Sequence, residues 1–222
     1  MANGFGPGLA KASQLSGAVT TITSLLKEDI VIGEDTQTKI DFETANEIHF
    51  DADNSERVKI DSTGLTVSGL VDVATELHFD SSPADGAVSG ITATFTAGEA
   101  LELGEVVYLK AADGKMYKAV SGVGGTGLIT PEIMCKAIVA QSTISADATG
   151  KFLLKGFIHA ATNFPTYAIG ETLYVPEAEA SGQNVPEGIV PDSTGDFVQV
   201  VGWAVTGDII YFNPDYTIIE HA

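Results

Sequence analysis

The stretch EIHFDADNSERVKIDSTGLTV, residues 47–67, decides the fold class of this protein. Apolar and polar side chains alternate along it, with Ile48 and Phe50 in one segment and Val58 and Ile60 in the next. A period of two residues is the signature of a β-strand with one buried face. The stretch therefore predicts short strands separated by polar turns, and we expect an all-β fold.

Copies of the same pattern lie on both sides of this stretch. The segment EIHFD at residues 47–51 returns as ELHFD at residues 76–80, and KID at residues 39–41 returns at residues 59–61. Such short strands cannot bury their apolar face within one chain. We therefore expect residues 28–82 to form a repetitive β base or shaft, intertwined with neighbouring chains. The candidate interface residues are Ile48, Phe50, Val58, Ile60, Leu65, Val67, Leu77 and Phe79.

The sequence after residue 90 predicts a second β domain with longer strands. The expected strands span residues 91–96, 105–110, 116–119, 134–141, 150–159, 172–175, 197–205 and 208–212. Glycine-containing turns separate them, which is typical of a barrel or sandwich. Two pairs of segments have similar sequences: LGEVVYL at residues 103–109 resembles IGETLYV at 169–175, and LKGF at 154–157 resembles VGW at 201–203. Glycine inside a strand often marks a bulge or a bend. We therefore predict that the members of each pair are neighbouring strands that close the domain.

The first 27 residues differ from both regions. Residues 3–8 are too rich in Gly and Pro for regular structure, and residues 9–26 fit a short helix, a strand or an extended arm. Small and aliphatic side chains suit close packing on another chain, so we predict an anchoring arm at residues 1–27. Residues 83–90 are then a linker to the C-terminal domain, residues 91–222. The expected anchoring residues are Phe5, Leu9, Leu15, Leu25 and Leu26.

The negative net charge of the chain argues against polyanionic partners. The 222 residues include 30 acidic and 11 basic side chains, giving a formal net charge of −19, and Arg57 is the only arginine. Binding to nucleic acid or to an anionic membrane needs clustered Lys and Arg, so neither is expected. The N-terminus lacks the pattern of a signal peptide and no run of 18 apolar residues occurs. We expect a soluble protein made in a cytoplasm.

No motif predicts an enzyme, a cofactor or a resident metal. Residues 122–127 match G-x-G-x-x-G, but Pro131 follows and no βαβ spacing exists, so a surface loop is expected. The acidic residues 51–56 lack the glycine and the closing glutamate of a calcium loop, and we predict a solvated turn, with weak cation binding across an oligomer as the alternative. Cys135 is alone in an apolar run that predicts a buried strand.

Histidine and aromatic residues leave alternatives open. For His49, His78, His159 and His221 we predict exposed strand positions, with metal binding or pH sensing as alternatives. Aromatic residues concentrate in the last third of the chain. Packing in a core or interface is the simplest interpretation, and a carbohydrate- or partner-binding face at Trp203, Tyr211 and Tyr216 is the alternative. A pair of acids that cleaves glycans leaves no local motif and also stays open.

Several segments together carry a family resemblance. GITATFTAGEALELGEVVYLK at residues 90–110, ISADATGKF at 144–152, IGETLYV at 169–175 and VQVVGWAV at 198–205 are similar to a β domain of tailed-bacteriophage virion proteins. Such domains occur in fibres and head-decoration proteins. The resemblance covers about residues 88–219. The repeats in residues 47–67 resemble the shaft repeats of phage fibres and tailspikes.

The resemblance implies a homotrimeric virion component without catalytic residues or cofactor. Its implied partners are its own copies and the major capsid protein or another virion protein. A shaft of only about 50 residues favours a cement protein that decorates the capsid exterior over a long fibre. The alternative is a receptor-binding tail-fibre tip that recognises host surface glycan, and a glycan-cleaving spike is a third interpretation.

Overall fold

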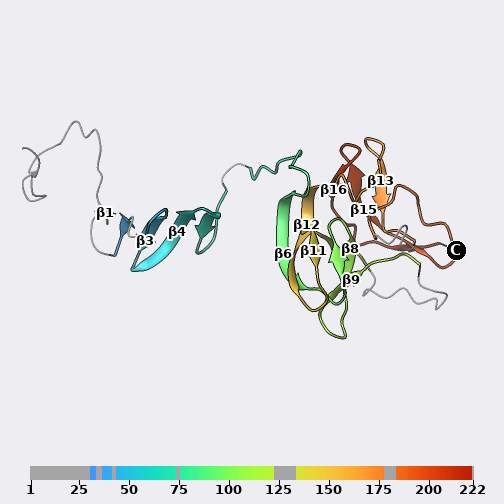
Figure 1. The fold of residues 1–222 in the computed structure, drawn as a ribbon, viewed down its shortest axis with the longest axis horizontal. Coiled ribbons are helices and arrows are strands. Elements are labelled where there is room, and N and C mark those ends of the chain that lie inside the picture. Colours follow the sequence, from blue (N-terminus) through green and yellow to red (C-terminus); the bar gives the residue numbers. More distant parts are fainter. Residues whose placement is uncertain are drawn as a thin grey trace, which may run out of the picture. The chain divides into compact units, whose positions relative to one another are not determined.

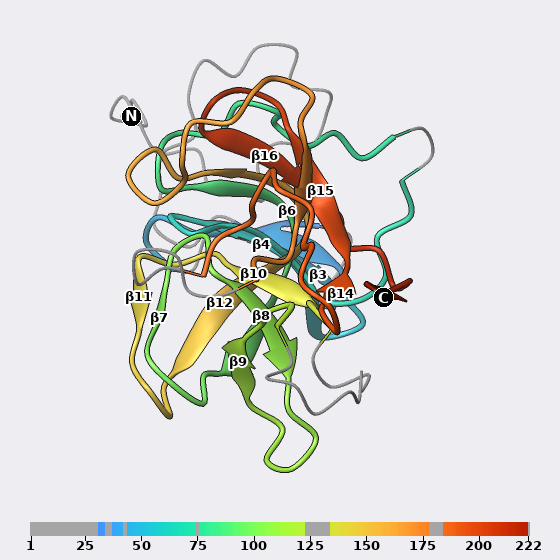
Figure 2. The same cartoon turned by 90° about the vertical axis from the view of Figure 1, so that its right-hand side faces the viewer.

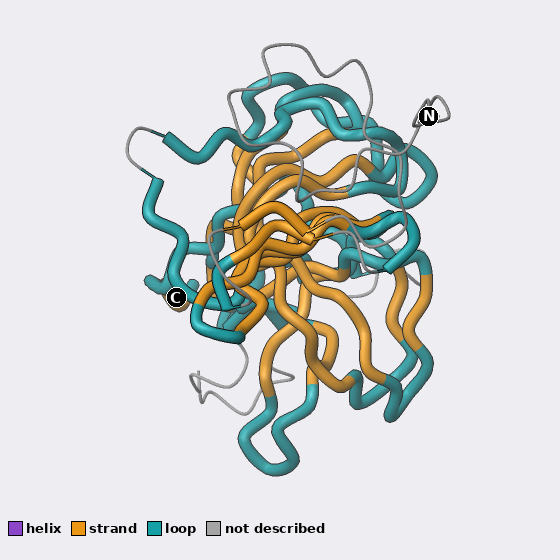
Figure 3. Tube along the Cα trace, turned by 90° about the vertical axis from the view of Figure 1, so that its left-hand side faces the viewer, coloured by secondary structure: helices purple, strands orange, loops and turns teal. Residues whose placement is uncertain are grey.

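The computed structural model describes residues 31–33, 37–41, 44–73, 76–122, 134–177 and 184–221. Within these ranges the regular structure consists of 17 β-strands, and Figure 3 shows strands and loops but no helix. The all-β fold expected from the alternating sequence is therefore confirmed. The chain divides into two compact units, Met1–Glu76 and Leu77–Ala222, and each is described by itself.

The first unit is an antiparallel sheet whose five strands follow one another in chain order (Figure 1). They are β1 (Val31–Gly33), β2 (Lys39–Asp41), β3 (Ile48–Ala52), β4 (Ser55–Asp61) and β5 (Gly64–Val67). Asp53 and Asn54 connect β3 to β4, and both have a φ of 54°. Asp and Asn tolerate this left-handed conformation, and two such residues match the twist of a hairpin. The acidic residues 51–56 thus contain a tight hairpin turn.

The last copy of the alternating pattern, residues 76–80, is not a strand. The prediction of a strand there is wrong for the single chain. The segment lies across the boundary between the units at Glu76 and Leu77, and no described strand pairs with it. Backbone groups in a strand need partners, so alternation alone cannot produce one. Leu77 stays exposed and Phe79 is half-buried.

The second unit is built around one long strand. Its main sheet contains β6 (Val88–Thr96), β8 (Val106–Leu109), β9 (Met116–Lys118), β10 (Ala137–Val139), β12 (Thr149–His159), β13 (Thr172–Tyr174), β15 (Val200–Ala204) and β16 (Ile209–Phe212). The order is β13-β15-β16-β12-β10-β8-β9, and β6 pairs with β12 off this path. Two small pairs complete the unit, β7 (Leu101–Glu102) with β11 (Thr143–Ile144) and β14 (Phe197–Val198) with β17 (Ile219–Glu220).

The main sheet forks along β12. One edge of β12 pairs with β6 over almost its whole length. The other edge pairs first with β10, at Phe152 and Leu153, and then with β16 from Gly156 onward. A bulge between Leu153 and Lys155 lies at the change of partner, and a bulge bends its strand and increases the local twist. The branches therefore diverge, and Figure 2 shows β8 and β9 on one side of the domain and β15 and β16 on the other.

Glycines allow the strands to approach closely beyond the fork. Gly156 has a φ of +142° and pairs with Gly90 of β6 on one side and with Phe212 of β16 on the other. A Cβ atom on Gly156 would lie 2.3 Å from the carbonyl oxygen of Ser89. Gly202 of β15 pairs with Phe212 from the far side. The prediction that the strands carrying Gly156 and Gly202 pair with each other is therefore wrong, since β16 lies between β12 and β15. Gly156 lets β12 approach β6, and Gly202 lets β15 approach β16.

The similar segments at residues 103–109 and 169–175 do not pair with each other either, contrary to the prediction. β8 lies between β10 and β9, whereas β13 pairs with β15 at the far end of the sheet. The two ends approach through the chain that follows these strands. The backbone N–H of Ser121 donates to Pro176 at 2.7 Å, and that of Phe197 donates to Ser121 at 3.2 Å. Connecting segments rather than paired strands thus draw the curled sheet together.

Apolar side chains fill both faces of the β12–β10–β8 branch. Val106 of β8 and Leu153 of β12 belong to the larger buried cluster. Their neighbours along the chain, Val107 and Phe152, belong to a second buried cluster. Strands buried on both faces have continuous apolar runs instead of alternation, which explains the sequence of these strands.

All eight strands expected after residue 90 have an observed counterpart. The sequence does not reveal the short strands β7, β11 and β17, nor the break between β14 and β15. Gln199 occupies that break and is buried. Its side-chain amide donates to the carbonyls of Cys135 and Asp215 and accepts from the N–H of Cys135 at 2.8 Å. Side-chain hydrogen bonds therefore satisfy backbone groups at this point of the fold.

Candidate functional site

The sheet of the first unit has one apolar face. Side chains directly opposite each other on paired strands share a face, and the register places Ile48 and Leu65 opposite Ile60, and Phe50 opposite Val58. The six predicted interface residues within the sheet therefore lie together: Ile48, Phe50, Val58, Ile60, Leu65 and Val67. None of them is buried, and the exposed fractions of Ile60 and Leu65 are 41% and 66%. The other two, Leu77 and Phe79, lie outside this sheet in the second unit.

The opposite face carries a charge network centred on His49. Its Nδ1 lies 2.5 Å from Oε2 of Glu56, and its Nε2 lies 3.0 Å from Oε2 of Glu47. Only a doubly protonated imidazole can donate to both carboxylates. His49 is buried, so the prediction of an exposed position is wrong, because the carboxylates of Glu47, just before β3, and of Glu56 on β4 flank the ring. His78, in the second copy of the motif, is exposed as expected.

Lys59 of β4 extends the network. Its Nζ lies 2.8 Å from Oδ2 of Asp61 and 3.9 Å from Oε1 of Glu47. The hydrogen bond to Asp61 raises the pKa of Lys59, and hydrogen bonds from Lys59 and Thr63 hold the pKa of Asp61 well below its ordinary value. Solvent-accessible pairs of this kind contribute little to stability. The charged face thus has partners for its charges within the chain, whereas no second layer of described residues covers the apolar face.

The acidic residues of the hairpin do not converge. Asp51 pairs with Lys39 at 3.5 Å, and Asp53 is exposed at the tip of the turn. Across the residues that the structure describes, no group of three or more His, Cys, Asp or Glu side chains is placed to hold a metal ion.

Three aromatic side chains form a row across neighbouring strands of the second unit. Phe157 of β12 lies opposite Tyr211 of β16, which lies opposite Trp203 of β15. The ring centroids of Phe157 and Tyr211 are 5.0 Å apart, and those of Tyr211 and Trp203 are 5.8 Å apart. Trp203 is 45% exposed, whereas its strand neighbours Gly202 and Ala204 are buried. The aromatic row, Phe157, Tyr211 and Trp203, therefore lies on the outer face of the sheet.

The aromatic row differs from the predicted ligand face by one residue. Trp203 and Tyr211 are in contact, but the ring of Tyr216 lies under Nζ of Lys136, at 5.1 Å from its centroid. Phe157 takes the third place in the row and was not among the predicted site residues. A signal for it exists in the sequence, because Phe157 and Trp203 each follow a strand glycine, Gly156 and Gly202. That pattern predicts a bend, and only the register shows that the two rings flank Tyr211.

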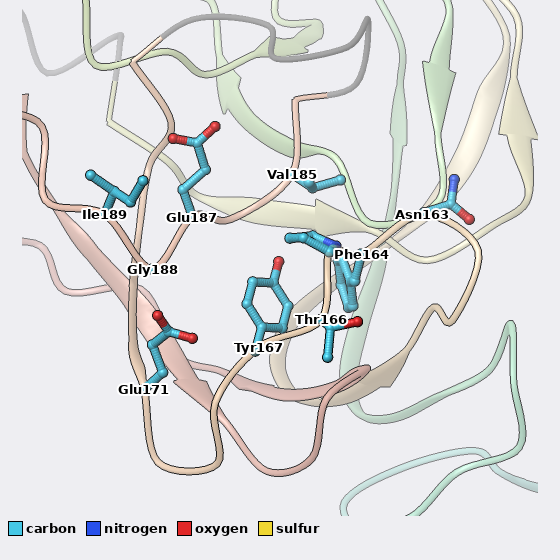
Figure 4. Close-up of a pocket in the computed structure, with 10 residues that line it drawn as sticks. Asn163, Phe164, Thr166, Tyr167, Glu171, Val185, Glu187, Gly188 and Ile189 are labelled. Carbon is cyan, nitrogen blue, oxygen red and sulfur yellow. The ribbon is translucent and has the colours of Figure 1, made fainter.

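A pocket of about 540 Å³ opens beside Tyr167 (Figure 4). The Tyr167 hydroxyl donates to the carbonyl of Pro186 at 2.6 Å, and burial raises the pKa of Tyr167. Figure 4 shows Glu171 and Glu187 on the same side of this ring. Burial, followed by the nearby charge of Glu177, raises the pKa of Glu187. The described lining has no basic side chain, so the pocket suits an apolar or cationic group rather than an anion.

Sequence reasoning missed this pocket because its residues come from two separate loops. One loop lies between β12 and β13, and the other precedes β14 and covers residues 185–189. Neither loop has a recognisable motif, so no signal in the sequence identifies the pocket.

His159 fastens the start of the second unit to the end of β12. Its Nδ1 lies 2.9 Å from the carbonyl oxygen of Pro83, and its Nε2 lies 3.2 Å from Oδ2 of Asp208. The hydrogen bond to Pro83, together with Asp208, raises the pKa of His159. His159 and His221 are half-buried, so the prediction of exposed positions is also wrong for them, because each packs against chain from elsewhere in the fold.

This contact predicts a pH dependence of stability. A raised folded-state pKa means that the His159 contact stabilises fully below the ordinary pKa of 6.5 and is lost as the pH rises through the folded-state pKa. The stability advantage of the wild type over His159→Gln should therefore be larger at about pH 5.5 than at about pH 9. Urea unfolding followed by the fluorescence of Trp203, the only tryptophan, measures it. His78→Gln is the control, and an advantage that grows with pH contradicts the assignment.

Cys135 is buried, and burial raises the pKa of its thiol to about 12. The thiolate is the reactive form of cysteine, so the folded protein should resist thiol reagents. We expect an aromatic disulfide reagent at about pH 8 to modify no thiol in the native protein and the single thiol of each chain in urea. Rapid modification of the native protein contradicts this prediction.

Some predicted features lie outside the described residues. The anchoring residues Phe5, Leu9, Leu15, Leu25 and Leu26 belong to residues 1–30, and most of the glycine-rich loop belongs to residues 123–133. The arm and the loop therefore remain predictions from sequence.

No model of a known protein family matches the chain, and no curated protein matches it. In the described ranges no helix is long and apolar enough to span a membrane. Within the described residues, three features can receive a ligand or a partner: the apolar face of the first unit, the aromatic row and the pocket beside Tyr167.

Proposed function

We propose that this protein is a non-enzymatic structural component of a phage virion that decorates or cements the capsid exterior as a homotrimer. The apolar face of the first unit carries the proposal. Its six aliphatic and aromatic side chains lie on one side of a single sheet, and none is buried within the chain. A sheet with one apolar face needs a second layer, and the described part of this unit contains only one sheet.

Other copies of the same chain supply that layer. The register places His49 and Asp51 of β3 opposite Lys59 and Glu56 of β4 on the other side of the sheet, so these four charged side chains lie away from the apolar face. Burying each large apolar side chain contributes roughly 1.5–3 kcal/mol, so three copies that share this face gain a strong drive to associate. The number of three chains in the proposed assembly comes from the resemblance to the shaft repeats of phage fibres.

Charge and packing support a role on the outside of a particle. A net charge of −19 per chain opposes nonspecific attachment to nucleic acid and keeps neighbouring assemblies apart. In the second unit, two groups that could react are engaged structurally. The carboxylate of Glu105 is buried 3.0 Å from Nζ of Lys118, and Cys135 is enclosed in the core. The partner on the particle is the major capsid protein or another virion protein, contacted through the N-terminal arm.

The number of copies in each particle tests this function. Particles of the phage that encodes the chain are purified, and its peptides are quantified by mass spectrometry against those of the major capsid protein. We expect hundreds of copies in each particle, because decoration follows the capsid lattice. A few tens or fewer would overturn decoration in favour of a tail fibre, and a chain missing from purified particles would overturn membership of the virion.

A further inference from the structure

We propose that the aromatic row of the second unit is a binding site for neutral carbohydrate. The register continues the row at both ends into side chains with hydroxyl groups. Ser89 of β6 lies opposite Phe157, and Thr172 of β13 lies opposite Trp203. Five adjacent strands thus place a hydroxyl, three aromatic rings with Tyr211 in the middle, and a second hydroxyl in one line.

The dimensions of this line suit a short oligosaccharide. Neighbouring strands lie about 4.8 Å apart, so the line extends for about 19 Å and the three rings for about 10 Å. Aromatic rings provide large apolar surfaces on which the C–H faces of sugar rings can stack. The Thr172 hydroxyl can bond to sugar hydroxyls and fix the orientation, as the few polar groups of a ligand site do. The Ser89 Oγ accepts from the backbone N–H of Asp80 at 2.8 Å, and its own proton is left to donate to a sugar.

The platform is held in place before any ligand arrives. Tyr211 contacts a ring on each side, and its strand β16 is hydrogen-bonded to β12 and β15. A Cβ atom on Gly202 would lie 2.0 Å from the carbonyl oxygen of Tyr211, so the strand carrying Trp203 approaches β16 as closely as its glycine allows. Rigid ligand-binding groups reduce the entropy lost on binding.

Area and charge distinguish sugar from other occupants. Trp203 is 45% exposed and the other two rings are half-buried, so the row exposes roughly 300 Å² at most, whereas a stable protein interface needs about 800 Å² from each partner. No charged side chain belongs to the five-residue line, and the chain carries a net charge of −19. Acidic glycans are therefore disfavoured and neutral ones fit.

This inference goes beyond the proposed structural role and does not depend on it. The line is complete within the second unit of one chain, whereas the proposed assembly uses the first unit. Failure of either proposal leaves the other standing.

Two measurements on the full chain test the site. The first is binding to a printed array of neutral and acidic glycans, followed by titration of the best neutral oligosaccharide against the fluorescence of Trp203. Because Trp203 is the only tryptophan, a shift in its emission reports contact at the row. We expect at least one neutral oligosaccharide to bind and shift the emission. Binding to acidic glycans alone, or to no glycan, overturns the proposal.

The second measurement is calorimetric titration of the same oligosaccharide with variants. We expect Trp203→Ala to weaken binding by at least about tenfold, and Trp203→Phe to retain part of the affinity. Tyr216→Ala is the matched control, because Tyr216 is an exposed aromatic residue outside the row, and its affinity should equal that of the wild type. Protection of Cys135 from thiol reagents shows that each variant is folded.

Two results from these variants overturn the proposal. Equal affinity of Trp203→Ala and wild type places the sugar elsewhere on the protein. A smaller particle mass for Trp203→Ala by light scattering assigns the row to an interface between copies instead.

Discussion

Replacing Leu65 with aspartate is expected to separate the assembled protein into single chains at micromolar concentration. Leu65 is 66% exposed in one chain and lies on the apolar face that we propose copies share. The substitution removes roughly 1.5–3 kcal/mol of burial from each copy, and burying an unpaired carboxylate costs more than that. Light scattering coupled to size-exclusion chromatography gives the mass, which should fall from three chains to one.

The next residue along the strand supplies a matched control. Thr66 lies opposite Lys59 on the charged face of the sheet, so Thr66→Asp adds the same charge on the other side of β5. The mass of this variant should equal that of the wild type. A wild type that is a single chain at micromolar concentration contradicts the assembly, and equal masses for Leu65→Asp and wild type contradict the choice of face.

Replacing Gly156 with alanine is expected to cost more than about 4 kcal/mol of the free energy of unfolding of the second unit, a loss large enough to need a specific steric cause. The new Cβ atom would lie 2.3 Å from the carbonyl oxygen of Ser89 and 2.6 Å from Cα of Gly90. These are backbone atoms of a paired strand, which cannot rotate away as a flexible side chain can. The φ of +142° adds backbone strain for any residue with a Cβ atom.

Gly195→Ala separates the steric clash of the new Cβ atom from the backbone strain of a positive φ. Gly195 has a φ of +90°, but a Cβ atom there meets nothing within 4 Å, so this variant should lose only about 1–2 kcal/mol. Urea unfolding followed by Trp203 fluorescence compares the variants, because Trp203 lies in β15 of the same unit. Similar losses for the two variants would mean that the β6–β12 pair can relax, and that close approach does not require the glycine.

The local pattern of the chain predicts most strands but not their neighbours. Alternation along residues 47–67 correctly predicts β3, β4 and β5, because side-chain alternation follows from the geometry of a strand. The same alternation at residues 76–80 produces no strand, since a strand needs hydrogen-bonded partners and no described strand pairs with this segment. The glycines at 156 and 202 predict bends, and a register shift does lie beside each of them, but the close approach of neighbouring strands that they allow appears only in the structure. Which strands approach is a property of the sheet order, and β16 lies between the two.

The sequence by itself determined the strand class, the two-part organisation of the pattern and the acidic charge, because each depends on residue types and spacing alone. Tertiary structure alone decided where the chemical groups meet. His49 is buried because Glu47 and Glu56 flank its ring, although its place in the alternation predicts exposure. Phe157 joins Trp203 because register aligns residues far apart in the chain across β16. Contacts between strands depend on pairing and bulges, which local periodicity does not encode.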